Sequence, residues 1–516
     1  MVANLENFPL LAELLSEQQR LDTPVARFSS AHDSGSVAQL SALNFQLIPL
    51  TAPQSGEQYA FEVDLDSCTG CKSCVAACHS LNGLDDTETW RDVGLLVSPS
   101  RAHPFTQTVT TACHHCADPA CLNGCPVLAY EKDPVTSIVV HLDDQCIGCS
   151  YCVLKCPYDV PKFSERLGIV RKCDMCHSRL ADGEAPACAQ ASPTHAIKIV
   201  TVPVPSLLPH LPSPNSDSRS PISTFLPGAP DPSYTQPTTR YISKRPLPEN
   251  LVAADARTLR PQPAHWPLAI MLTLLPAAVG LQIVAASSTA IVTYYVTSAA
   301  GSSRELVTYY VTIAAAALGA AGLGASVFHL GQPLRAWRIF LGWRKSWLSR
   351  EALVFGPWFA LTAAAPLLHW TMDLRHWSFS VAAAATGLLG LCCSAMIYID
   401  THRHFWRASQ TVPRFFGTAA AVGLAMLDPR AAALLLLGKL AWESRTYFDG
   451  SVSARLQRGP LAAIVATRDL LGLAALIMLV VSPSVFALIP LLAGELAERL
   501  LFFRAVDAPK MPGLPA

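Results

Sequence analysis

The sequence predicts two different folds in one chain: a cysteine-rich α+β domain first, and an all-α polytopic membrane domain after it. The chain has 516 residues, which is too long for a single domain. Fifteen of its 17 cysteines lie between Cys68 and Cys188. The second half is instead rich in Ala, Leu, Val and Gly and poor in charge, which is the composition of membrane-spanning helices.

Charge and the N-terminus narrow the classes of function. The formal net charge is 0 and the pI is near 7.2, so a nucleic-acid-binding protein, which needs a basic surface, is not indicated. Residues 1–57 are polar and rich in loop-forming residues. They show no signal peptide and no twin arginine. A short apolar patch, residues 10–15, predicts a surface helix in this N-terminal extension.

Residues 58–201 contain four groups of cysteines. The groups are Cys68, Cys71, Cys74 and Cys78; Cys113, Cys116, Cys121 and Cys125; Cys146, Cys149, Cys152 and Cys156; and Cys173, Cys176 and Cys188. The first and third have the C-x2-C-x2-C-x3-C spacing of bacterial ferredoxins, in which the fourth cysteine serves a second cluster. Zinc sites favour pairs of CxxC, and a disulfide framework would require export. We therefore expect a ferredoxin-like iron–sulfur domain built from two modules with two clusters each.

A linker and a membrane domain follow. Residues 202–264 are dominated by Pro, Ser and Thr without periodicity, which predicts an extended linker. Residues 265–516 hold the spans, each needing about 20 apolar residues. Clear candidates are 267–287, 307–328, 352–370 and 379–399. The stretch 413–445 is either one long span or two short ones, and 469–504 reads as two spans broken near Pro483 and Pro490. We expect eight spans, with seven as the alternative.

The order of the cysteine groups resembles the four-cluster subunit of the dimethyl sulfoxide reductase family of molybdoenzymes. The resemblance implies that the first group pairs with the fourth, and the second with the third. Three implied ligand sets are Cys113, Cys116, Cys121 and Cys156; Cys146, Cys149, Cys152 and Cys125; and Cys173, Cys176, Cys188 and Cys78. The last set is Cys68, Cys71, Cys74 and the residue at position 192. The implied cofactors are three [4Fe-4S] clusters and a fourth cluster.

Position 192 departs from the family pattern. The motif expects cysteine before Pro193, but this chain has Ser192. Three outcomes are open: a [4Fe-4S] cluster with a serine ligand, a [3Fe-4S] cluster, or a [4Fe-4S] cluster completed by His195 or solvent. We expect the site to be filled and its potential altered, because ligand identity tunes the potential.

The membrane half resembles the anchor of the same family, in the stretch from His329 through Arg335 to Glu351. Tyr398 and the closing Glu498-Arg499 stretch add to this resemblance. The family's matching His and Glu lie around a quinol pocket. We expect His329 to bond a quinone oxygen, Glu351 to relay protons, and Arg335 to form the polar rim. Trp337, Trp343 and Trp347 predict an interfacial belt, and no haem is expected because most histidines lie outside the spans.

The resemblance implies the partners: a catalytic subunit that holds molybdopterin, quinone and the lipid bilayer, with no nucleic acid. The loops on the side of the cysteine domain hold twelve Lys and Arg residues and the opposite loops three, which predicts that this domain faces the cytoplasm. That orientation favours sulfite oxidation as the reaction of the complex over quinol-driven nitrate or other oxyanion or S-oxide reduction. A second class of function is a proton-translocating module, in which Lys439, Glu443, Glu495 and Glu498 line a proton path; the alternative is that these charges cap short spans at the membrane interface.

Overall fold

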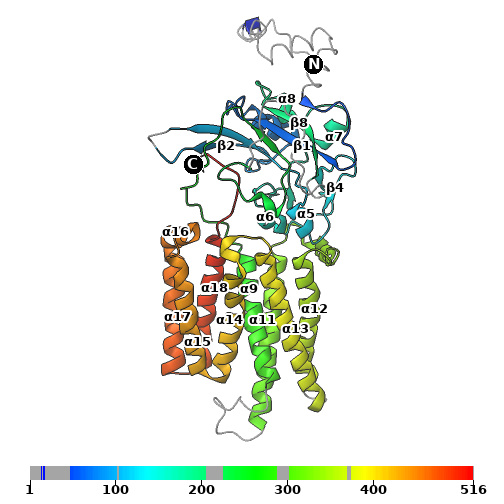
Figure 1. Cartoon of the computed structure of the whole chain (residues 1–516). Helices are drawn as coiled ribbons and strands as arrows, with labels where there is room; N and C mark the ends of the chain where they lie inside the picture. Colours follow the sequence, from blue (N-terminus) through cyan, green and yellow to red (C-terminus); the bar gives the residue numbers. More distant parts are fainter. Residues whose placement is uncertain are drawn as a thin grey trace.

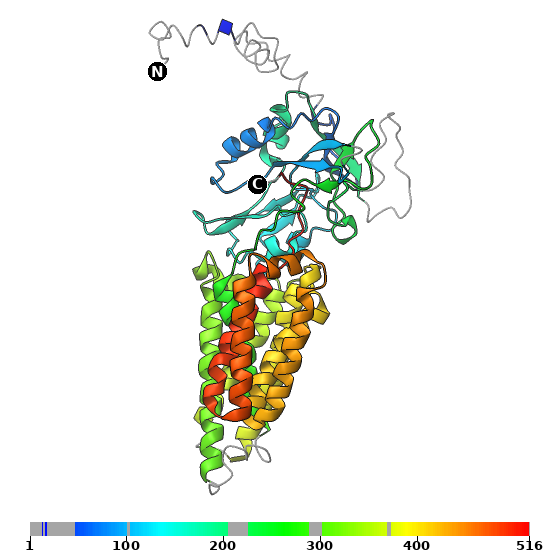
Figure 2. The same ribbon diagram turned by 90° about the vertical axis from the view of Figure 1, so that its left-hand side faces the viewer.

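The computed structural model describes residues 13, 16–17, 47–100, 104–204, 225–287, 302–368 and 373–514. Their side chains are described too, except for 302–307, 367–368 and 373–378. A mixed domain of strands and short helices sits on one end of a bundle of long helices (Figures 1 and 2). The predicted surface helix at residues 10–15 lies largely outside the described residues.

Two three-stranded sheets form the outer part of the mixed domain. In the first, β1 (Glu57–Asp64) pairs antiparallel with β8 (Ile197–Pro203) and parallel with β9 (Arg240–Ile242). In the second, β2 (Asp92–Val97) lies between β3 (Thr106–Thr111) and β10 (Val252–Ala253). The first and last strands of the cysteine region, β1 and β8, are thus hydrogen-bonded to each other in one sheet.

Two short hairpins and five short helices complete the domain. The hairpins are β4 (Tyr130–Lys132) with β5 (Val139–His141), and β6 (Lys162–Ser164) with β7 (Ile169–Arg171). The helices are α4 (Ser73–Asn82), α5 (Ala120–Gly124), α6 (Tyr151–Lys155), α7 (His177–Ala181) and α8 (Ala187–Gln190). Helix α4 packs on α8, and α5 packs on α6. This is a ferredoxin-like arrangement of two modules.

The expected linker at 202–264 needs correction where the structure describes it. Residues 225–264 supply β9 and β10, and Tyr241, Leu226 and Leu251 are buried in the core of the cysteine domain. The sequence did not predict these strands, because they are only three and two residues long and lie in a Pro-rich segment. Residues 205–224 of the predicted linker lie outside the described residues.

The described part of the second half contains eight helices of 16 or more residues. They are α9 (Trp266–Ala286), α11 (Ser302–Val327), α12 (Trp347–Leu368), α13 (Asp373–Ile399), α14 (Ala408–Leu427), α15 (Pro429–Ser444), α17 (Ala462–Val481) and α18 (Leu488–Arg504). Four of them, α9, α11, α13 and α17, contain windows long and apolar enough to cross a membrane. Helix α9 is the most enclosed of the four and packs against α11, α13, α14 and α18.

The ambiguous stretch 413–445 forms two helices. Helix α14 ends at Leu427 and α15 begins at Pro429, and the Asp428 carboxylate between them accepts hydrogen bonds from the amides of Arg430 and Ala431. The aspartate thus caps α15, and proline at the first helical position is compatible with the helix start. Of the two predicted breaks farther on, only Pro483 separates helices, since Pro490 lies in the first turn of α18.

The C-terminal segment after α18 leaves the bundle and returns to the cysteine domain (Figure 1). Met511 is buried in the core of that domain, and Lys510 forms an ion pair with Asp255. The backbone of Pro512 presses against β2, where a Cβ added to Gly94 would lie 1.7 Å from the Pro512 oxygen. The boundary of the anchor at residue 516 is therefore corrected, because its last residues belong to the packing of the other half.

Candidate cluster sites and quinone cavity

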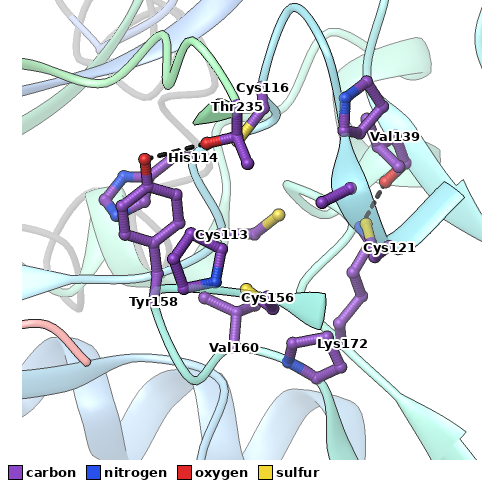
Figure 3. Close-up of a pocket in the computed structure, with 14 residues that line it drawn as sticks. Cys113, His114, Cys116, Cys121, Val139, Cys156, Tyr158, Val160, Lys172 and Thr235 are labelled. Atoms are coloured by element: carbon purple, nitrogen blue, oxygen red, sulfur yellow. Dashed lines mark hydrogen bonds between the residues drawn. The ribbon is translucent and has the colours of Figure 1, made fainter. Parts of the chain in front are cut away.

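Four cysteines from two sequence groups line a common hollow in the middle of the cysteine domain. Their sulfur atoms, from Cys113, Cys116, Cys121 and Cys156, are turned toward this space (Figure 3). Tyr158, whose hydroxyl bonds Thr235 at 2.9 Å, and Lys172 stand at its edge. The second group therefore shares a site with the last cysteine of the third group.

The other cysteines gather in the same crossed manner. A second hollow is lined by Cys125, Cys146, Cys149 and Cys152, and a third by Cys68, Cys71, Cys74 and Ser192. In the remaining set, the Cys78 thiol interacts electrostatically with Cys188 and Cys176, and Cys173 interacts with Cys78 and Cys188. Three of the expected ligand sets thus each line one hollow, and the thiols of the remaining set lie within electrostatic reach of one another.

The local backbone explains how the loops curl around these hollows. Gly70 and Gly148 occupy the same position between the first two cysteines of the first and third groups, with φ of 73° and 68°. Glycine takes this left-handed conformation at little cost. The Gly148 amide then points at the Cys146 sulfur at 3.4 Å, as the Met175 amide does at Cys173. Such amide contacts stabilise thiolates.

The donor sets fit iron–sulfur clusters better than single metal ions. The cysteines are free rather than joined as disulfides. Four sulfur donors drawn from two sequence groups suit a cluster that is bound by four thiolates. Burial raises the pKa of Cys156 and Cys176 to about 11, so both thiols need a metal to become thiolates at neutral pH.

Ser192 faces the outermost hollow. Its side chain is buried, and its hydroxyl oxygen accepts a hydrogen bond from the Ala196 amide at 3.0 Å. His195, which we considered as a replacement ligand, does not line this hollow. Ser192 is therefore better placed than His195 to face this hollow, and Cys71, which also lines it, is exposed.

Three basic side chains that sequence reasoning missed lie among the sulfur atoms. Arg91 is close to thiols of the first and fourth groups, Lys172 to Cys113, Cys121 and Cys173, and His141 to Cys146. Burial alone would raise the pKa of Cys146, but His141 and backbone amides bring it below its ordinary value. No spacing in a single sequence marks such residues: Arg91 directly precedes β2, Lys172 directly follows β7, and His141 is the last residue of β5.

The cysteine domain is fastened to the bundle through the third cysteine group. The Tyr151 hydroxyl donates to the Ile397 carbonyl at 3.1 Å, and Lys155 forms an ion pair with Asp400 at 2.5 Å. Gly331, after α11, lies so close to Gly168 that an added Cβ would be 2.1 Å from the Gly168 oxygen. The hollow that includes Cys149 is thereby held directly above the helices.

A cavity of about 140 Å³ opens at this junction. His329 and Glu351, the predicted quinone-site residues, both line it together with Cys149, Tyr151 and Tyr398, and most of its surface is apolar. The Glu351 carboxylate accepts a short hydrogen bond from the Ser394 hydroxyl. Burial lowers the pKa of His329, although a hydrogen bond with the Cys149 backbone opposes that shift. The imidazole of His329 and the carboxylate of Glu351 therefore line the same cavity as Cys149, a cysteine of one cluster site.

Arg335 does not line this cavity, which corrects its expected place at the rim. Its guanidinium lies 3.3 Å from the Cys146 carbonyl and 3.5 Å from that of Asp143, so it binds the cysteine domain instead. Arg350 bonds the carbonyls of Trp343 and Arg344 and lies 4.3 Å above the Trp347 ring. Trp337 and Trp343 are exposed, in keeping with an interfacial belt.

The four charges considered for a proton path are buried in ion pairs. Lys439 bonds Glu443 at 3.2 Å and also Glu495, while Arg468 bonds each of these glutamates at 3.0 Å. Beside them, Glu498 pairs with Arg414 and Arg499. We call this set the ion-pair network: Arg414, Lys439, Glu443, Arg468, Glu495, Glu498 and Arg499. It joins α14, α15, α17 and α18 inside the bundle rather than capping helices at their surface.

Comparison with known families agrees with both halves. A model described as "4Fe-4S dicluster domain" matches residues 105–202, and one described as "DMSO reductase anchor subunit (DmsC)" matches residues 263–443. The chain is 34% identical to the B subunit of the anaerobic dimethyl sulfoxide reductase of Haemophilus influenzae over 155 residues, which is 28% of this chain and 75% of the relative.

Two relatives from Escherichia coli K12 give the same result. Identity to the B subunit of its anaerobic dimethyl sulfoxide reductase is 35%, over 27% of this chain and 72% of the relative. Identity to the formate dehydrogenase-O iron-sulfur subunit is 33%, over 33% of this chain and 62% of the relative. The last of these relatives is named as an iron–sulfur subunit. This membrane protein therefore belongs to the dimethyl sulfoxide reductase family of molybdoenzyme subunits, and it joins the family's iron–sulfur electron-transfer subunit and membrane anchor in a single chain.

Proposed function

We propose that this chain passes electrons between a molybdopterin catalytic subunit and the membrane quinone pool, and that quinone reacts in the cavity at the junction. The observation that carries the proposal is that Cys149, His329 and Glu351 line one cavity. Bound iron–sulfur clusters exchange single electrons without protons, whereas a quinone exchanges two electrons and two protons. The cavity must therefore bring proton-transferring side chains next to a cluster.

His329 and Glu351 are suited to that task. The His329 ring is held near the Cys149 backbone and can donate to a quinone oxygen, since imidazole carries its proton on either nitrogen. Glu351 is buried and bonded to Ser394, so its carboxyl group can pass a proton toward an oxygen of the quinone. Arg335 has a positioning role in this proposal, because it holds the loop between α11 and α12 against the carbonyl of Cys146.

The proposed ligand sets follow the crossed grouping of the thiols. Three sets of four cysteines would hold [4Fe-4S] clusters, and Ser192 would complete the fourth site with Cys68, Cys71 and Cys74. Electron paramagnetic resonance of the oxidised protein tests the fourth site. A signal near g of about 2.01 would indicate a [3Fe-4S] cluster. A total of three clusters in the purified chain would contradict an occupied site.

The cysteine domain is proposed to face the cytoplasm. Arg335, Arg338 and Arg403, counted among the basic loop residues, bond backbone carbonyls of the cysteine domain, and Arg414 and Arg468 belong to the ion-pair network. The other seven of the twelve have neither of these two roles and still outnumber the three basic residues on the other side. The side chains of two of those three, Arg304 and Arg375, lie outside the described residues. Protease treatment of right-side-out vesicles should leave this domain intact, and cleavage would reverse the orientation.

The terminal substrate is decided in the catalytic partner. Sulfite oxidation, expected from the proposed orientation, is not favoured by the relatives, which are named for dimethyl sulfoxide and formate. Sulfite-dependent reduction of a quinone analogue by the purified complex tests it directly. Absence of that activity in a complex that contains molybdenum would favour quinol-driven reduction of nitrate or another oxyanion or S-oxide.

The quinone reaction is tested with His329→Ala and Glu351→Gln in the intact complex. Each change should lower quinone turnover by about tenfold or more, while the clusters remain visible by paramagnetic resonance. His404→Ala is a matched control, because this histidine is exposed and bonds Arg407 outside the cavity. Unchanged turnover in His329→Ala would instead indicate a passive anchor.

Proton translocation is the second candidate function, and the burial of the ion-pair network is the observation that favours it. Buried charges inside a helical bundle often mark proton paths. Each glutamate of the network is already paired with a cation, however, which suits a structural role equally. Proton uptake in sealed vesicles separates the two, because a pump moves more protons than the quinone reaction consumes.

A further inference from the structure

Arg91 lies between two of the proposed cluster sites. It immediately precedes β2, and its side chain is buried to 2% exposure in the outer half of the cysteine domain. Its guanidinium interacts electrostatically with Cys74, which lines the Ser192 hollow, and with three thiols of the neighbouring site, Cys78, Cys173 and Cys188. One cation therefore faces ligands of two different sites.

The immediate surroundings fix the guanidinium in this place. One terminal nitrogen of Arg91 donates to the Thr110 hydroxyl at 3.2 Å, and that hydroxyl lies 3.6 Å from the Cys74 sulfur. The ring of Phe61 covers one face of the guanidinium, with its centroid 4.5 Å away. Phe61 and Thr110 belong to β1 and β3, so strands of both outer sheets hold Arg91 in position.

The charge of Arg91 has no carboxylate partner among the described residues. Glu88, the nearest acidic residue before it in the chain, already bonds Arg171, and Nε and the second terminal nitrogen of Arg91 have no hydrogen-bond partner there. Burying a guanidinium without an anion beside it is unfavourable, because the charge loses its hydration and gains no ion pair. The anionic charge that balances it must come from the sulfur sites.

We infer that Arg91 is a positioning residue for electron transfer. Its positive charge is shared by two clusters, called here the outer clusters: the one proposed at Cys68, Cys71, Cys74 and Ser192, and the one proposed at Cys78, Cys173, Cys176 and Cys188. This charge raises the reduction potential of both. A cation near a cluster favours the reduced, more negative state over the oxidised one. This inference rests on the proposed ligand sets. It gives the Ser192 site a second source of altered potential besides its oxygen ligand, and it couples that site to its neighbour through one side chain.

The inner sites have other basic neighbours: Lys172 also faces Cys173 of an outer site, whereas His141 faces Cys146 of the site nearest the membrane, so the prediction is specific for that last site. Lys172 bonds the carbonyls of Val139 and Cys173 and lies among Cys113 and Cys121, and His141 lies beside Cys146. Removing the charge of Arg91 should therefore lower the potentials of the two outer clusters and leave the potential of the cluster nearest the membrane unchanged.

The experiment is a redox titration of the intact complex, followed by paramagnetic resonance, for wild type and Arg91→Gln. Iron content and cluster number are measured first in the wild type: three clusters or fewer would contradict the proposed ligand sets and with them this inference, whereas four clusters with unshifted outer potentials in Arg91→Gln would contradict this inference alone. Cys176→Ser identifies the signal of the fourth-group site. The expected result for Arg91→Gln is a downward shift of both outer potentials.

Arg245→Gln is the matched control. Arg245 also stacks near an aromatic ring, 5.7 Å from the centroid of Phe105, but it is more than half exposed and pairs with Asp66. Its removal takes the same charge from the same domain, and solvent screening should leave the potentials near their wild-type values. Equal shifts of all four clusters in Arg91→Gln, or no shift of the outer two, would overturn the inference.

Arg91→Lys keeps the test decisive if the glutamine variant assembles without its outer clusters. A lysine ammonium is a single point charge and cannot face both sites as the forked guanidinium does. At least one outer potential should then fall while the cluster nearest the membrane keeps its own. Two unchanged outer potentials in a fully assembled Arg91→Lys complex would show that the charge of residue 91 does not tune them.

Discussion

Arg91 in the cysteine domain and Arg468 in the helical bundle are both buried arginines, but their charges are balanced in different ways. Arg468 bonds the carboxylates of Glu443 and Glu495, each at 3.0 Å. Arg91 has no carboxylate partner among the described residues and faces thiols instead. The bundle thus neutralises its own charges within the chain, whereas the charge balance of the cysteine domain is completed by its clusters. The halves should respond differently to loss of a carboxylate and to loss of iron.

The largest expected effect is in the bundle. Glu495→Gln removes the carboxylate shared by Lys439 and Arg468 and leaves buried positive charge behind. Breaking a buried ion pair by removing one partner costs about 3–5 kcal/mol. The free energy of unfolding of the detergent-solubilised chain, followed by helical circular dichroism, should fall by that amount.

A double variant is the control for that measurement. Glu495→Gln combined with Lys439→Met removes one charge of each sign and leaves Arg468 with Glu443. Its loss of stability should be smaller than that of Glu495→Gln alone, since no unpaired charge remains. A single-variant loss below about 1 kcal/mol would mean that the network is exposed to water.

Removal of iron should affect the other half. Without metal, the buried thiols are protonated at neutral pH, because burial raises the pKa of Cys125 and Cys156 to about 11. Arg91 then lacks an anion, and metal binding no longer contributes to folding. Protein produced under iron limitation should be cleaved between residues 58 and 201 at least about tenfold faster than loaded protein. The bundle should survive as a fragment, and equal protection of both halves would contradict this division.

The C-terminal segment is where the two halves share one core. Met511→Ala empties a buried position in the cysteine domain, and a methionine truncated in a core costs about 2–5 kcal/mol. We expect the lower end of that range, confined to local opening, because the segment is short. Hydrogen exchange of residues 505–514 should measure it. Leu514→Ala, at an exposed position in the same segment, should change exchange little.

The sequence predicted the features that depend on spacing or on long apolar runs. The cysteine groups line common hollows, and the first four helices of the bundle lie close to their predicted ranges. Both features could be predicted because thiol spacing and span length are local properties of the sequence. The crossed grouping of the thiols came from resemblance to a family. No local signal encodes it, since it depends on how α4 meets α8 and α5 meets α6.

The features that were missed depend on long-range packing. Strand β9 has three residues in a Pro-rich segment, and it forms only because the edge of β1 is open to a parallel partner. Met511 is one apolar residue among prolines, and it is buried because the polypeptide turns back from α18. The sequence placed Arg335 at the rim of the quinone pocket because this residue is close to His329 along the chain. In the structure its side chain bonds the carbonyl of Cys146 instead.

The smallest expected effect concerns a surface charge, and it tests whether exposure accounts for the contrast between the halves. Asp66 is exposed and accepts bonds from the Lys244 amide at 2.6 Å, from Arg245 at 3.0 Å and from Ser243 at 3.1 Å. Burial is the largest single influence and raises the pKa of Asp66, but these bonds together outweigh it and bring the pKa below the ordinary 3.8. Because the folded pKa is lowered, the stabilisation is present above pH 3.8 and is lost as the pH falls through the folded value. Asp66→Asn should therefore cost less than about 1 kcal/mol at pH 7 and nothing near pH 2, since solvent screens the pair. Thermal unfolding of the wild type and of Asp66→Asn at the two pH values measures this difference in stability. A loss of stability at pH 7 as large as that of Glu495→Gln would mean that burial does not set the strength of charge pairs in this protein.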